Sequence, residues 1–135
     1  MFVSQMGARI ADFVSRKCWA VVGVSADAEK YGHRVFATLL NAGYEVMGVN
    51  PKNGVILGRQ IYRSLAGLPV KPEVVDIVVP PTITESIVKQ CADLGITRVW
   101  MQPGAESEAA IEFCREHSIE VVWGECAMVH HLEWE

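Results

Sequence analysis

The sequence predicts an α/β domain in which a mainly parallel sheet of five strands lies between two layers of helices. Short apolar runs alternate with segments of helical periodicity, the breaks between them are short, and no segment is repeated. Continuous apolar runs are typical of strands covered on both faces, and strands that alternate with helices usually pair in parallel. We therefore expect one three-layer αβα domain over residues 1–135, with an N-terminal helix within 1–16 and a C-terminal tail at 128–135.

The first half of the chain predicts two helices and two strands. Residues 2–14 have the spacing of an amphipathic helix, and residues 18–24 form a continuous apolar run that predicts a buried strand. Apolar residues at helical spacing predict a helix over 32–42, which Gly43 ends. Residues 44–49 form the second predicted strand.

The second half continues the alternation after a glycine-containing loop at residues 51–58. Residues 74–79 predict a third strand, which the proline pair 80–81 ends. Thr82 and Glu85 have the spacing of a capping box, in which two side chains satisfy free N–H groups at a helix start. The same periodicities predict a fourth strand at 98–101, a helix at 106–117 and a fifth strand at 120–123. Together these elements predict a Rossmann-like domain.

Composition excludes several classes of protein. No apolar run approaches the roughly 18 residues of a membrane span, and the N-terminus lacks the basic start of a signal peptide. A net charge of −4 without a basic cluster argues against nucleic acid as a partner. The four cysteines form neither a C-x-x-C pair nor a Cys/His metal spacing, so we expect reduced thiols and no metal site. A cytoplasmic protein with a small-molecule ligand is the simplest interpretation.

The loop after the first strand is the first candidate for a binding site. In this architecture ligands bind beyond the carboxyl ends of the strands, where the strand order reverses. Gly23, Val24 and Ser25 form a turn that leads through Lys30 to Gly32 and a helix start, where free N–H groups can hold a phosphate. Because only the first glycine of the G-x-G-x-x-G fingerprint is present, a purely structural turn remains an equal alternative.

The end of the second strand favours particular nucleotides. NAD-binding domains usually place Asp or Glu here to hold the ribose hydroxyls, whereas this chain has Asn50, followed by Pro51 and Lys52. A lysine favours a ligand with a phosphate near its adenosine ribose, and both NADP and coenzyme A (CoA) have one. The alternative is an ordinary turn in which Lys52 is a solvated charge.

Five short motifs occur in a characteristic order along the chain: Val22-Gly23-Val24-Ser25, Val49-Asn50-Pro51, Tyr62-x-Ser64-Leu65, Val78-Val79-Pro80-Pro81 and Trp100-x-Gln102-x-Gly104. With these motifs the chain resembles small CoA-binding proteins over residues 16–130. Those proteins are stand-alone Rossmann-like domains, similar to the CoA-binding part of the succinyl-CoA synthetase α subunit.

The resemblance implies CoA as the cofactor and a role for each loop. The diphosphate would be held by the turn at Gly23, Val24 and Ser25 and by the helix start. The ribose and its 3′-phosphate would lie by Asn50 and Lys52, and the adenine would face Val79, Pro80 and Pro81. The path of the pantetheine arm would be lined by Met101, Gln102, Pro103 and Gly104. The first loop also carries Asp27 and Glu29, and two acids disfavour a diphosphate unless they point to solvent.

The sequence shows no base beside an obvious nucleophile. The synthetase relatives use a phosphorylated histidine from a separate domain, for which this chain is too short. We therefore expect a protein that binds CoA or an acyl-CoA without catalysis of its own, as a homodimer or with a partner CoA enzyme. The alternatives are an NAD(P)-binding module or fragment of an oxidoreductase, and a ligand-controlled regulatory module. Cys126 follows the last strand, where a thiol ligand could arrive, although a small buried hydrophobe is the commoner role of a free cysteine.

Overall fold

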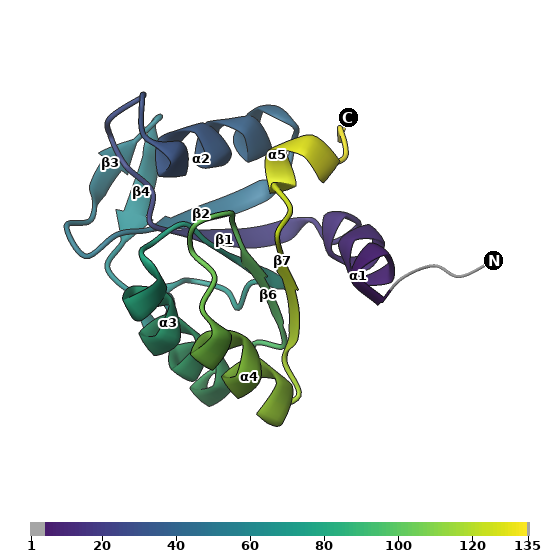
Figure 1. Ribbon diagram of the computed structural model, residues 1–135. Helices are drawn as coiled ribbons and strands as arrows, with labels where there is room; N and C mark the ends of the chain where they lie inside the picture. Colours follow the sequence, from purple (N-terminus) through teal and green to yellow (C-terminus); the bar gives the residue numbers. More distant parts are fainter. Residues whose placement is uncertain (1–4, 135) are drawn as a thin grey trace.

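Seven strands form one sheet in the computed structural model, which describes residues 5–134 (Figure 1). The helices are α1 (Gln5–Val14), α2 (Tyr31–Asn41), α3 (Pro81–Asp93), α4 (Glu108–Glu116) and α5 (Ala127–His130), with a short 3-10 turn at Leu65–Gly67. The strands are β1 (Cys18–Val22), β2 (Glu45–Val49), β3 (Gly54–Ile56), β4 (Arg59–Tyr62), β5 (Val74–Ile77), β6 (Arg98–Met101) and β7 (Glu120–Trp123).

The strand order is β3-β4-β2-β1-β5-β6-β7, and only β3 and β4 pair antiparallel among the described residues. The predicted mainly parallel sheet is therefore confirmed, but the predicted number of five strands is wrong. The two additional strands form a hairpin within the predicted loop and its continuation. They are too short for an apolar run, and a turn with positive φ at Leu57 (52°) and Gly58 (74°) joins them. The hairpin extends the sheet because β4 pairs with the end of β2.

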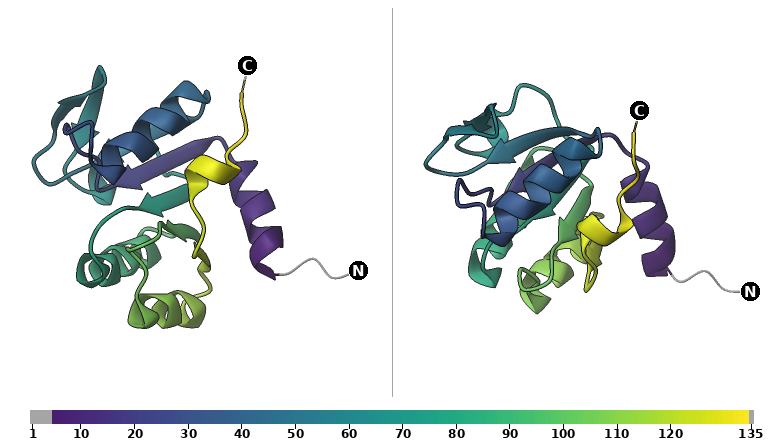
Figure 2. Two further views of the ribbon diagram at one scale, coloured as in Figure 1. Left: turned by 45° about the horizontal axis from the view of Figure 1, so that its top comes forward. Right: turned by 90° about the horizontal axis from the view of Figure 1, so that it is seen from above.

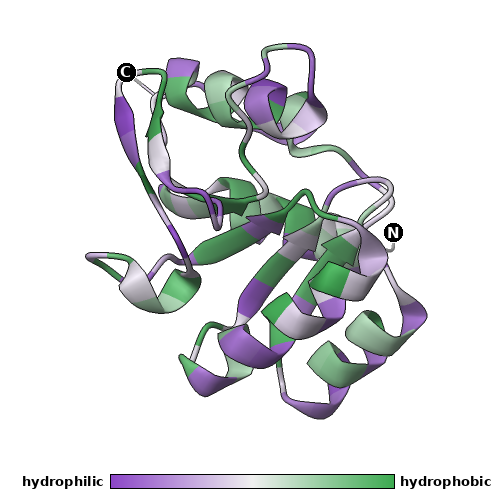
Figure 3. Ribbon diagram, turned by 90° about the vertical axis from the view of Figure 1, so that its left-hand side faces the viewer, coloured by the Kyte–Doolittle hydropathy of each residue, from purple (hydrophilic) through white to green (hydrophobic). Residues whose placement is uncertain are grey.

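Helices cover both faces of the sheet (Figure 2). One hydrophobic cluster includes Trp19, Trp100 and Phe36 and packs beneath α1, α2 and α5. The other includes Ile77 and Val88 and packs beneath α3 and α4. The strands between them are hydrophobic over most of their length (Figure 3), as expected for a sheet that is buried on both faces.

The start of α3 differs from the predicted capping box. The helix begins at Pro81 with Pro80 as its N-cap residue, and no side chain of residues 5–134 caps it. A proline is favourable at the first helical position because the N–H it lacks would have no partner there. Glu85 instead accepts a hydrogen bond from the Ser107 hydroxyl at 2.6 Å, and Ser107 caps α4 by accepting from the Ala110 N–H.

Both chain ends differ in detail from the sequence predictions. The first three residues of the predicted helix 2–14 lie outside the described residues. At the other end, the predicted tail begins with α5 and then packs on the domain. The Trp134 ring lies 5.7 Å from the Tyr44 ring, and the backbone N–H of Trp134 donates to Ala42 O at 2.7 Å. Over residues 5–134, no helix has both the length and the apolar character that crossing a membrane would require.

Candidate functional site

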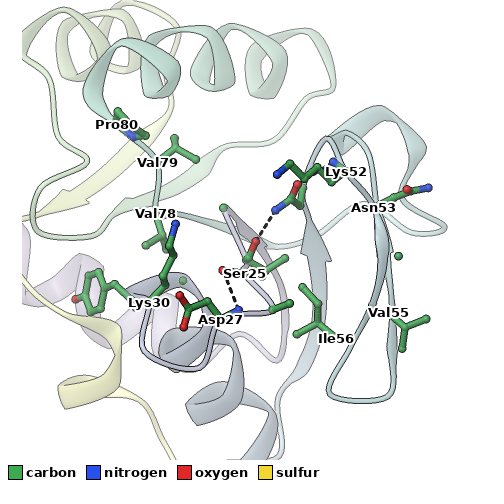
Figure 4. A pocket seen from close by; sticks show the side chains of 17 residues that line it. Ser25, Asp27, Lys30, Lys52, Asn53, Val55, Ile56, Val78, Val79 and Pro80 are labelled. Carbon is green, nitrogen blue, oxygen red and sulfur yellow. Dashed lines mark hydrogen bonds between the residues drawn. The ribbon is translucent and has the colours of Figure 1, made fainter.

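The order of the strands reverses between β1 and β5. The strands β2, β3 and β4 lie on one side of β1, and the later strands β5, β6 and β7 lie on its other side. A cavity of about 770 Å³ lies outside the carboxyl ends of these strands (Figure 4). We call it the first cavity. It is lined by residues 23–27, 30–32, 50, 52–56 and 78–80. This is the place where open parallel sheets bind their ligands.

Two glycines allow the backbone segments beside the first cavity to pack closely. Gly23 has φ +106°, and a Cβ there would collide with the carbonyl group of Val78. A Cβ on Gly32 would collide with the carbonyl oxygen of Gly23. The turn after β1, the end of β5 and the first turn of α2 are therefore in direct contact. This contact places the start of α2 beside the cavity, and no side chain caps this helix at Lys30.

Hydrogen bonds within the turn orient Ser25. Its hydroxyl oxygen accepts from the Asp27 N–H at 3.1 Å, so its own proton stays free to be donated to a ligand. Its carbonyl oxygen accepts from Nδ1 of His33 at 2.8 Å, which assigns the proton to that nitrogen. His33 thus holds the loop, while Ser25 lines the cavity.

The Asn50 side chain joins the loops after β1 and β2. Its Nδ2 donates to Val24 O at 2.7 Å, and its Oδ1 accepts from the Lys52 N–H at 2.8 Å. Asn50 lines the cavity, but both ends of its amide already have protein partners. A ribose contact would therefore use the second hydrogen atom of Nδ2 or the second lone pair of Oδ1. Lys52 is exposed and also lines the cavity.

The charged side chains that line the first cavity are those of two lysines and one aspartate. Lys30 and Lys52 line it with Asp27, whereas Glu29 is exposed and does not. Asp27 accepts a hydrogen bond from the Glu29 N–H at 3.0 Å, so one of its oxygens is used within the loop. The cavity is therefore locally positive in a chain of net charge −4, which favours an anionic ligand.

A second cavity, of about 400 Å³, adjoins the first. They share Tyr31, Val78, Val79 and Pro80, and the second adds Pro81, Pro103, Gly104 and Ala105. Its lining is therefore apolar apart from Tyr31. The two cavities together make one elongated site with a charged end and an apolar end.

Three predicted site residues line neither cavity: Pro51, Met101 and Gln102. Met101 is the last residue of β6 and is fully buried in the hydrophobic cluster beneath α3 and α4. Gln102 is also fully buried, and its amide belongs to a polar chain behind the site. Of the four residues predicted for the pantetheine arm, Pro103 and Gly104 line the second cavity, whereas Met101 and Gln102 are buried.

That polar chain joins α2 and β5 with the loops after β6 and β7. Gln102 Nε2 donates to Asp76 Oδ2 at 2.9 Å, and Gln102 Oε1 accepts from the Tyr31 hydroxyl at 3.1 Å. The Tyr31 oxygen also lies 2.8 Å from Cys126 Sγ. Asp76 is fully buried, and this burial raises the pKa of its carboxyl group to about 8 even though the Gln102 hydrogen bond lowers it. Asp76 is therefore largely protonated at neutral pH.

Tyr31, Val78 and the residues of β3 also line the cavities and were not among the residues predicted from the sequence. The turn of the hairpin is Leu57-Gly58, which is not one of the pairs typical of such turns, whereas the typical pair Asn53-Gly54 lies at the start of β3. Nothing comparable marks Tyr31, whose place depends on the close contact between α2 and the turn at Gly23.

A parallel sheet with a positively charged cavity at its switch point and an uncapped helix start beside it defines a nucleotide-binding α/β domain. The model of the CoA binding domain family matches residues 17–132, and the chain belongs to this family. The resemblance predicted from the loop motifs is confirmed.

Relatives of two kinds share this domain. The chain is 26% identical to the Bacillus subtilis protein YneT over 125 residues, 92% of this chain and 93% of YneT. A hypothetical protein from Pyrococcus horikoshii OT3 has a similar structure, with TM-score 0.88 and 32% identity, over 97% of this chain and 95% of that one. Subunit alpha of the ADP-forming acetate–CoA ligase I of Pyrococcus furiosus is 33% identical over 86 residues, 59% of this chain. The match covers only 19% of that subunit. The chain is homologous to the CoA-binding part of such ligase subunits.

Proposed function

We propose that this domain binds coenzyme A or an acyl-CoA across the first and second cavities and does not itself catalyse a reaction. The observation that carries the proposal is the elongated site, whose charged end continues into an apolar end through shared residues. CoA has the matching chemistry, with three phosphates at one end and an uncharged pantetheine arm at the other. The family to which the chain belongs supports the same ligand.

The phosphates have three groups of donors at the charged end. The uncapped N-terminus of α2 supplies backbone N–H groups and the positive end of the helix dipole. The Ser25 hydroxyl has a free proton beside them. Lys52 lies at the loop after β2, where a 3′-phosphate on the ribose would be expected. The diphosphate is therefore assigned to α2 and Ser25, and the 3′-phosphate to Lys52.

The uncharged parts of the ligand have apolar walls. Val79 and Pro80 follow β5, and Ile56 faces the first cavity from the hairpin (Figure 4). A flat adenine ring is expected between these apolar groups, which also fit the usual composition of small-molecule sites. The pantetheine arm would continue past Tyr31 towards Gly104.

The absence of catalysis is proposed from the residues that line the site. Among the described lining residues, the ionisable side chains are those of Asp27, Lys30, Tyr31 and Lys52. Among the described residues, none of these side chains forms a hydrogen bond with the Ser25 hydroxyl, so no base is placed to activate it. A domain of this kind would hold or present the ligand for a partner enzyme. The ligase subunits in which the homologous domain forms only a part support such an arrangement.

Calorimetric titration tests the proposal. The purified chain is titrated with CoA, acetyl-CoA, dephospho-CoA, NADPH and NADH. We expect CoA and acetyl-CoA to bind, dephospho-CoA to bind more weakly because it lacks the 3′-phosphate, and NADH not to bind. No heat from CoA at millimolar concentration would overturn the proposal. Tighter binding of NADPH than of CoA would instead support an NADP-binding module.

A further inference from the structure

Cys126 differs in position from the other three cysteines. Cys91 and Cys114 are buried in the hydrophobic cluster beneath α3 and α4, and burial raises the pKa of each thiol to about 12. Cys18 begins β1 and therefore lies at the amino edge of the sheet, opposite the two cavities. Cys126 follows β7 at the carboxyl edge, is half-buried and has no disulfide partner. It is the cysteine on the side of the ligand site.

Tyr31 connects the Cys126 thiol with the ligand site. The Tyr31 side chain belongs to the lining of both cavities, and its hydroxyl oxygen lies 2.8 Å from Cys126 Sγ. A group that passes Tyr31 in the second cavity is therefore one side chain away from the sulfur. In the proposed function, the part of the ligand that passes Tyr31 is the pantetheine arm, which ends in a thiol.

The polar chain behind Tyr31 allows its hydroxyl to change hydrogen-bond partners. The hydroxyl has one proton and two acceptors in reach, Gln102 Oε1 at 3.1 Å and Cys126 Sγ. When the sulfur is a thiolate, Tyr31 can donate to it, because Gln102 Oε1 keeps a second donor in the Ala127 N–H at 3.4 Å. When the sulfur is a thiol, its proton can be donated to the Tyr31 oxygen.

Asp76 forms the inner end of this cluster. It is fully buried, and its Oδ1 has no hydrogen-bond partner among the described residues. Burial raises the pKa of the Tyr31 hydroxyl, and its hydrogen bond with Cys126 raises it further. The hydroxyl therefore stays protonated and remains a donor. A thiol, a hydroxyl that can serve it and an unpartnered buried carboxyl group thus form one hydrogen-bonded cluster, which reaches the ligand cavities through Tyr31.

We propose that Cys126 is a thiol–disulfide exchange site for the ligand's pantetheine end; this inference rests on the proposed function. A CoA disulfide binds with one half in the two cavities. The Cys126 thiolate attacks the sulfur of the bound half, the Cys126–CoA disulfide forms, and the other CoA leaves as a thiolate that takes up a proton. The bound disulfide is the oxidant, so no further reactant is needed. Attack by a CoA thiolate on the CoA sulfur of this mixed disulfide reverses the step and releases the Cys126 thiolate.

Intact-protein mass spectrometry after incubation with CoA disulfide tests the inference. We expect one CoA adduct, which peptide mapping places on Cys126. The adduct should be absent from Cys126→Ser and unchanged in the matched control Cys18→Ser. Its rate should saturate with CoA disulfide and exceed the rate with oxidised glutathione by at least about tenfold, because binding places the two sulfurs together. Desulfo-CoA, which lacks the thiol, should slow it by competition.

Tyr31→Phe separates the role of the hydroxyl from that of the ring. The ring still lines both cavities, so the half-saturating concentration of CoA disulfide should be unchanged, whereas the limiting rate should fall. A fall in the limiting rate at unchanged half-saturation supports the assigned role of the hydroxyl. An unchanged limiting rate contradicts it.

Two results would overturn the exchange site. Equal labelling of Cys18, or labelling of Cys126 at the same rate by oxidised glutathione and without competition from desulfo-CoA, would show that binding does not direct the reaction. Calorimetry with desulfo-CoA separates the two proposals. Binding of desulfo-CoA without labelling of Cys126 contradicts only the exchange site, whereas no binding contradicts the proposed function and the exchange site with it.

Discussion

The side-chain amide of Asn50, at the end of β2, donates a hydrogen bond of 2.7 Å to the carbonyl oxygen of Val24 in the turn after β1. The same amide accepts from the Lys52 N–H. One side chain therefore sets the distance between the turn assigned to the diphosphate and the lysine assigned to the 3′-phosphate. A residue chosen in the sequence as a ligand contact acts first as a link between two loops.

Asn50→Ala should lower both stability and CoA affinity. The substitution leaves Val24 O and the Lys52 N–H without their partner, which costs about 1–3 kcal/mol of unfolding free energy. Urea unfolding and calorimetry measure the two effects. Asn41→Ala, at the exposed end of α2, is the control and should change neither. Unchanged stability of Asn50→Ala would contradict the structural role of this amide.

Lys52→Ala should weaken CoA binding about tenfold, because it removes a charged hydrogen-bond donor to the 3′-phosphate. Binding of dephospho-CoA should be almost unaffected, since that ligand lacks the phosphate. Calorimetry with both ligands measures the difference. Lys89→Ala, an exposed lysine on α3 that lines neither cavity, controls for the change in net charge. An equal loss with both ligands would assign Lys52 to another part of CoA.

Gly23→Ala should destabilise the domain by about 1 kcal/mol or more, because of the positive φ and the collision with the Val78 carbonyl. The movement needed to relieve the collision would displace the turn from α2, so CoA binding should also be lost. The control is Gly67→Ala, whose Cβ would meet only Ser64 Oγ, at 3.9 Å. If Gly23→Ala binds CoA as the wild type does, the close contact at β5 is not required for the site.

Asp76→Asn should flatten the dependence of stability on pH. Burial raises the pKa of Asp76 from 3.8 to about 8, so the native state holds one more proton than the unfolded state between these values. The stabilising contribution is complete below this window and is lost as pH rises through it, at about 1.4 kcal/mol per pH unit. An amide mimics the neutral acid and cannot ionise. The variant should therefore gain stability relative to the wild type as pH rises.

Urea unfolding at several pH values within this window measures the Asp76 effect. Asp93→Asn, at the exposed end of α3, removes the same formal charge from the surface and serves as the control. Parallel curves for the wild type and Asp76→Asn would show that Asp76 titrates alike in the native and unfolded states.

The longer elements could be predicted from local patterns. The strands β1, β2, β5, β6 and β7 each coincide with an apolar run, because a strand buried on both faces needs apolar residues at successive positions. The hairpin of β3 and β4 could not be recognised in this way, since its strands have three and four residues and lie at the edge of the sheet. The capping box at Thr82 was also misleading, because Glu85 has a partner in Ser107 from another element.

Some residues of the candidate site could likewise be predicted from local sequence patterns, and others could not. Gly23, Ser25 and Lys52 could be chosen from the sequence because their loops follow strands of a parallel sheet. Tyr31 and Asp76 could not be connected, since they are 45 positions apart and meet only through Gln102.

The sequence by itself determined the alternation of strands and helices, the edge of the sheet at which a ligand would bind and the CoA-binding family. These follow from hydrophobic periodicity and from short motifs, which are local properties of the chain. Only the tertiary structure decided that β3 and β4 extend the sheet, that Asn50 links two loops, and that Met101 and Gln102 are buried. It also decided that Tyr31 joins Cys126 to the cavities. The physical reason is that such contacts join residues far apart in the chain, and their geometry depends on how whole elements pack.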